Sequence, residues 1–78
     1  MTQARLHLTF PEHTLGEPIV WRLGHEFGLV TNIRRANVED LYGWVILEVD
    51  GSDENLARAL GWLTDEGVQV DRIDDEER

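Results

Sequence analysis

Trp44-Val45-Ile46-Leu47-Glu48-Val49 is the stretch of sequence that decides the fold. Its apolar residues occupy both odd and even positions, which is typical of a strand in the interior of a sheet. The turn-compatible residues 39–43 precede it and predict a hairpin. Gly51 and Ser52 end it, and Ser52 or Asp53 can cap the first turn of a following helix. The stretch therefore predicts a central strand between a hairpin and a helix.

Two more strands are predicted upstream. Residues 5–10 alternate between apolar and polar side chains, the pattern of a strand with one buried face, and Pro11 ends it. Residues 29–38 are rich in β-branched residues, but their apolar side chains do not alternate regularly between the two faces of a strand. In simple alternation Ile33 points one way while Ala36 and Val38 point the other. We therefore expect a bulge or a strong twist between them.

Two helices and a last strand complete the pattern. Pro18 suits a first helical position, and Gly28 suits a helix end because glycine adopts the left-handed conformation without strain. A second helix is expected to end at Gly67, and a fourth strand lies at residues 68–73. The apolar stripes of the two helices are Ile19, Leu23 and Phe27 in the first, and Leu56, Leu60 and Leu63 in the second.

The resulting order is strand, helix, strand, strand, helix, strand. It predicts an α+β protein, a ferredoxin-like βαββαβ sandwich in which two helices cover one face of a four-stranded antiparallel sheet. Residues 1–73 form the single domain, and the acidic tail 74–78 is expected to be disordered. The uncovered face carries Trp44 and Ile46 beside the polar Arg5 and His7. Function is expected on that face.

Composition narrows the function classes. The 78 residues carry a formal net charge of −9, which repels phosphate backbones and anionic lipids, so nucleic acid is not an expected partner. The absence of cysteine excludes disulfides and thiolate metal sites. No apolar run approaches the ~20 residues of a membrane span. We expect a cytoplasmic protein without membrane insertion.

The residues that carry chemistry in other proteins form no reactive set here. His7, His13 and His25 lack the spacing of metal ligands, and Ser52 sits in a helix-capping context. We therefore predict no enzymatic activity, no metal site and no cofactor. Arg34 and Arg35 either hold a carboxylate or balance neighbouring acids.

Short segments along nearly the whole chain resemble one known family. They include Leu8-Thr9-Phe10, Glu17-Pro18-Ile19, Asn32-Ile33, Gly43-Trp44-Val45-Ile46-Leu47, Val49-Asp50-Gly51, the helix from Ala57-Arg58-Ala59 to Leu63, and Gly67-Val68-Gln69-Val70. The family is the NIL domain, a small module at the C-terminus of methionine-importer ATPase subunits. Its Asn-Ile-Leu motif reads Asn32-Ile33-Arg34 in this chain.

The resemblance implies a paired regulatory domain that binds methionine between sheets. The expected ligand-binding residues are Asn32, Ile33, Arg34, Trp44 and Ile46, with self-association as a dimer through the uncovered face or the edge of the second strand. The chain lacks the G-x-x-x-x-G-K-[ST] loop, so a sensor of this kind acts on a partner protein. The alternative is a structural adaptor that dimerises or docks on a partner without a small ligand, in which Asn32 only bridges backbone groups.

Overall fold

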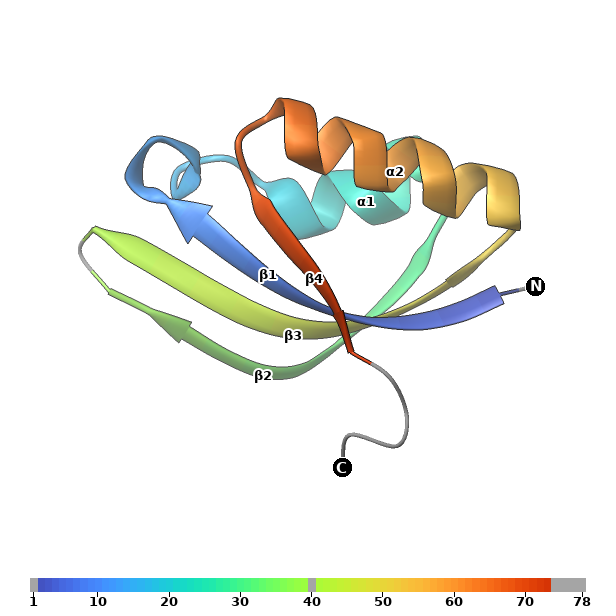
Figure 1. The fold of residues 1–78 in the computed structure, drawn as a ribbon, viewed down its shortest axis with the longest axis horizontal. Coiled ribbons are helices and arrows are strands. Elements are labelled where there is room, and N and C mark those ends of the chain that lie inside the picture. The colour runs from blue at the N-terminus through green and yellow to red at the C-terminus, as the bar shows by residue number, and fades with distance from the viewer. Residues whose placement is uncertain (1, 40, 74–78) are drawn as a thin grey trace.

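A computed structural model describes residues 2–39 and 41–73 (Figure 1). The elements are β1 (Thr2–Pro11), a 3-10 turn η1 (Glu12–Thr14), α1 (Ile19–Phe27), β2 (Val30–Val38), β3 (Tyr42–Gly51), α2 (Asp53–Asp65) and β4 (Gln69–Ile73). The four strands form one antiparallel sheet in the order β2-β3-β1-β4, so β3 is a central strand as predicted. The predicted tail 74–78 lies outside the described residues.

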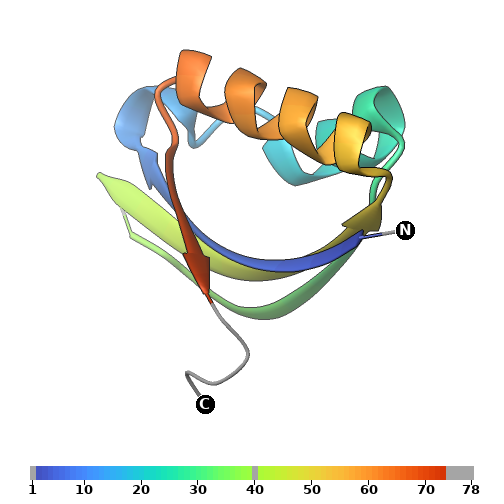
Figure 2. The ribbon, with the colours of Figure 1, turned by 45° about the vertical axis from the view of Figure 1, so that its right-hand side comes forward.

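Both helices lie on the same face of the sheet, and Figure 2 shows the strands curving toward them. The predicted α+β sandwich is therefore confirmed. The core lies between the helices and this face, because alternate residues of β1 and β3 point inward. Its least exposed large side chains are Leu6, Leu8, Leu23, Leu47, Val49 and Leu63. Neither helix of the described ranges is long and apolar enough to span a bilayer.

Local signals set the helix ends. The Ser52 hydroxyl accepts a hydrogen bond from the Asn55 backbone N–H at 3.0 Å, which caps α2 as predicted. Gly28 ends α1 with φ 67°, and Gly67 follows α2 with φ 92°, both left-handed conformations. Pro18 precedes α1 as its N-cap, one residue outside the expected first helical position.

The predicted irregularity of β2 is a bulge at Arg34. Ile33 pairs with Leu47 and Arg35 pairs with Ile46, so Arg34 is the extra residue. The bulge places Ile33 and Ala36 on the same side of the sheet, which resolves their conflicting phases. This strand lies at the edge, where the helices do not cover it, and Ile33 is 55% exposed.

Candidate functional site

A row of polar side chains crosses the uncovered face of the sheet. Glu48 on β3 lies opposite Arg5 on β1 and Asn32 on β2. Arg5 Nη2 donates to Glu48 Oε2 at 2.6 Å, and Arg34 Nη1 lies 3.9 Å from Glu48 Oε1. We call Arg5, Asn32, Arg34 and Glu48 the Glu48 cluster. It joins three strands and places both signs of charge beside an amide.

The Glu48 cluster carries more positive than negative charge. The hydrogen bond from Arg5 lowers the pKa of the Glu48 carboxyl; the positive charge of Arg34 acts in the same direction and desolvation acts against both. Glu48 is therefore ionised at neutral pH. Two guanidinium groups face one carboxylate, which leaves the cluster with an excess positive charge.

One donor of the cluster lacks a partner. Arg5 Nε is buried and forms no hydrogen bond with any other described residue. A polar hollow of about 50 Å³ lies beside it, lined by Gln3, Ala4, Arg5 and Glu48. Buried polar groups are nearly always paired, so this N–H is a donor that the described residues leave unused, although the surrounding atoms shield it from direct contact with solvent.

Apolar groups border the cluster along β3. Ile46 lies opposite His7 on β1 and Arg35 on β2. Trp44 lies further along the strand, where its ring stacks on His7 with centroids 5.5 Å apart. At roughly 3.4 Å per residue, Trp44 is about 14 Å along the strand from Glu48. The apolar surface next to the cluster is therefore Ile46, with Trp44 at its far end.

The five residues expected from the sequence do not all come together. Asn32 and Arg34 lie in the cluster and Ile46 borders it. Trp44 is on the same face but opposite Asn37, remote from Asn32. Ile33 pairs with the buried Leu47 and so faces the helix side of the sheet.

Sequence reasoning missed Arg5 and Glu48 as site residues. Glu48 is the single charged residue within the apolar stretch 44–49, and that isolation is a signal that was available. The sequence alone did not indicate that Arg5 is the partner of Glu48, because Arg5 lies 43 positions away along the chain. Only the pairing register of β1 and β3 brings them together.

A second hollow lies on the helix side of the sheet. Its volume is about 260 Å³, and it opens between the end of β1, the start of α1 and Val38 of β2. Trp21, 60% exposed, stands at its border, and Glu17 is its one charged lining residue. This hollow and Asn32 lie on opposite faces of β2, so one copy of the chain cannot bring both to the same small ligand.

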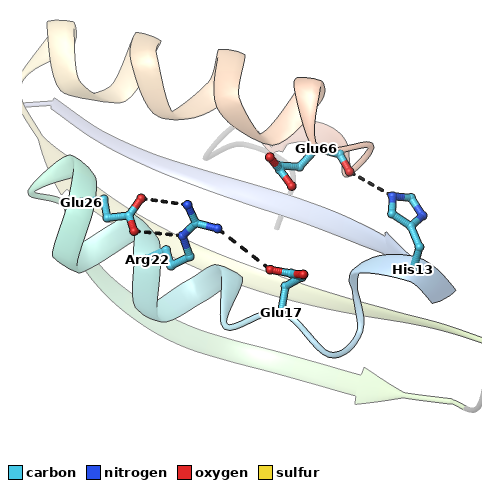
Figure 3. Close-up of polar contacts among 5 residues, drawn as sticks. All are labelled: His13, Glu17, Arg22, Glu26 and Glu66. Carbon is cyan, nitrogen blue, oxygen red and sulfur yellow. Dashed lines mark hydrogen bonds and ion pairs between the residues drawn. The ribbon is translucent and has the colours of Figure 1, made fainter.

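Two further sets of polar contacts lie at the ends of the helices (Figure 3). Arg22 forms an ion pair with Glu26 at 3.0 Å and lies 4.0 Å from Glu17, while His13 Nε2 lies 3.1 Å from the Glu66 carbonyl oxygen. The hydrogen bond to Glu26 raises the pKa of Arg22. These contacts tie helix ends and neighbouring turns.

The described part of the chain holds no cluster of three His, Cys, Asp or Glu side chains suited to a metal ion.

Fold and site together define a small α+β sandwich whose uncovered face carries a polar cluster. A protein-family model, the NIL domain, matches residues 4–72, and the chain belongs to this family. The resemblance found in the sequence is therefore confirmed. No curated protein sequence matches the chain.

Solved structures with a similar fold include the following two. One is the C-terminal domain of an ABC transporter/ATP-binding protein from Enterococcus faecalis, with TM-score 0.78, 18% identity, and coverage of 92% of this chain and 84% of that chain. The other is the de novo designed protein Ferredog-Diesel, with TM-score 0.51, 13% identity, and coverage of 94% and 85%. At these identities the similarity concerns the fold alone.

Proposed function

We propose that this chain is a non-enzymatic regulatory module that binds a free amino acid on the uncovered face of its sheet. Methionine is the candidate that the resemblance to NIL domains implies. The similar fold of an ABC transporter C-terminal domain supports a regulatory role beside a transport ATPase. The observation that carries the proposal is the Glu48 cluster, which offers both charges and an amide within one row.

These groups match the head group of an amino acid. The Glu48 carboxylate accepts from the ligand ammonium, and Arg5 and Arg34 donate to its carboxylate. The Asn32 amide can serve either group, and the β2 backbone at Ile33 adds a further contact. The ligand side chain then lies along Ile46 toward Trp44, an apolar path that accepts a thioether.

Pairing of two copies is part of this proposal. A small domain has little core to spare, so association adds stability and can cover a bound ligand. Val30 is 64% exposed and Ile46 and Trp44 are partly exposed on the uncovered face, while β2 has one neighbour only in the described sheet. Both the face and the edge of β2 are therefore available as pairing surfaces. The localisation proposed for the module is cytoplasmic.

The alternative function is that of an adaptor that docks on a partner protein without a ligand. The stack of His7 on Trp44 favours it, because a rigid aromatic pair on a polar face suits a protein interface. Under this alternative, Asn32 has no ligand and the cluster only fixes the register of β1, β2 and β3.

Thermal unfolding in the presence of amino acids separates the two functions. Ligand at 100 times its dissociation constant adds about 2.7 kcal/mol, and this corresponds to a melting-point rise of roughly 10–20 °C for a domain of this size. We expect methionine or another amino acid to give such a shift and N32A to remove most of it. N55A is the matched control, since the Asn55 side chain lies on α2, on the opposite side of the sheet from the cluster. An unmoved melting curve across all common amino acids would exclude the sensing function and favour the adaptor.

A further inference from the structure

More arginine side chains gather around the Glu48 cluster than its one carboxylate can pair with. Arg5, Arg34 and Arg35 all lie on the uncovered face, although the whole chain has only seven basic residues against sixteen acids. Asp50 and Asp71 share this face, but within the described ranges no ion pair joins them to these arginines. Among the same residues, Glu48 is the one acid paired with them.

The bulge determines where this charge lies. In a regular strand Arg34 and Arg35 would point to opposite faces. Because Arg34 is the extra residue, its guanidinium reaches Glu48 while Arg35 stands opposite Ile46 on the same face. Arg35 therefore flanks the apolar path proposed for the ligand side chain. No ion pair holds Arg35 among the residues that the structure describes.

The hollow beside Arg5 is a second place at which an anionic oxygen of a ligand can bind, in addition to Arg35. Its walls are polar, and the buried Nε–H of Arg5 has no partner among the described side chains. A carboxylate bound at the hollow accepts from the Arg5 guanidinium, which keeps its bond to Glu48 through Nη2. The head-group carboxylate of a ligand is therefore expected at Arg5, and the side chain is directed over Ile46 to Arg35.

We propose that the site selects an amino acid with a carboxylate in its side chain, aspartate or glutamate, over methionine. This inference rests on the proposed function and concerns the same site. The ligand ammonium meets Glu48, its head-group carboxylate meets Arg5 and Arg34, and its side-chain carboxylate meets Arg35. The thioether of methionine offers Arg35 no strong hydrogen-bond acceptor and displaces water from its guanidinium, which weakens binding.

Calorimetric titration at constant ionic strength tests the inference. The purified chain is titrated with glutamate, aspartate, glutamine, asparagine, methionine and acetate. We expect glutamate or aspartate to bind about tenfold or more tightly than its amide and than methionine, the difference of one charge-assisted pair. In R35Q the preference for acid over amide disappears, while the affinity for the amide is unchanged. R58Q is the matched control, because Arg58 lies exposed on α2 and should leave all affinities as they are.

Each outcome has a separate meaning. If methionine binds more tightly than glutamate, the selectivity inference is wrong and the amino-acid-binding function stands. If R35Q keeps the preference for the acid, Arg35 is not the selecting residue and the inference fails. If acetate binds as tightly as glutamate, the site recognises a carboxylate alone and selects no amino acid. Absence of binding by every amino acid removes both the inference and the proposed function.

Discussion

Replacing Gly67 by alanine should destabilise the domain at the point where α2 ends. Gly67 has φ 92°, and a Cβ built there would lie 3.0 Å from Nε2 of His13 and 3.1 Å from Cε1. The left-handed conformation costs a non-glycine residue about 1–2 kcal/mol. Displacement of His13 also weakens its contact with the Glu66 carbonyl, worth about 1 kcal/mol. We expect a loss of about 2–3 kcal/mol from a total of about 4–12 kcal/mol for a chain of this length.

Urea unfolding followed by circular dichroism measures this loss. The midpoint of G67A should fall with an unchanged m-value, and its melting point should drop by roughly 8–24 °C. G61A is the control: Gly61 lies exposed inside α2 with nothing within 4 Å of a Cβ, so alanine there should stabilise by about 0.5–1 kcal/mol. If G67A is as stable as the wild type, neither the left-handed backbone at Gly67 nor the His13 contact contributes to stability at this helix end.

Three further predictions concern the helix cap, the Glu48 cluster and the uncovered face. S52A should lose about 1 kcal/mol in urea unfolding, because the Asn55 N–H loses its acceptor; an unchanged midpoint would exclude the cap. The pKa of Glu48 is lower in the folded chain than in the unfolded chain. The Glu48 carboxylate therefore stabilises the fold above its ordinary unfolded pKa of about 4.3, and this stabilisation is lost as pH falls through the lower folded value. E48Q should therefore show a shallower decline of the melting point with acid than the wild type, and parallel curves would contradict this. W44A should lower the mass measured by light scattering at high micromolar concentration from that of a dimer toward that of a monomer. If the wild type is itself monomeric, Trp44 is not part of a dimer interface.

Much of the fold could be predicted from the sequence because its signals are local. Alternation in residues 5–10 and the capping group of Ser52 act within one strand or one helical turn. The bulge was also predictable, since Ile33 and Ala36 can share a face only if one residue is added between them. The identity of the extra residue was not, because several positions restore the same phase.

The site was less predictable, because it depends on register. Whether Asn32 lies beside Glu48 or Trp44 is decided by the pairing of β2 with β3, and a shift of one position would turn Asn32 to the other face. The family motif places Asn32 and Ile33 together in sequence, but a strand directs adjacent side chains to opposite faces. Contacts such as Arg5 with Glu48 require the assembled sheet.

The bulge at Arg34 also bears on aggregation. An uncovered edge strand is a template on which other chains can add, and fibril-forming segments are typically about six or seven residues long. Arg34 divides the paired part of β2 into 30–33 and 35–38, four residues each. Each half is shorter than such a segment, and charged side chains stand at the break between them. The same extra residue that shapes the polar cluster thus limits fibrillar stacking along an edge that carries the exposed Val30, Ile33 and Val38.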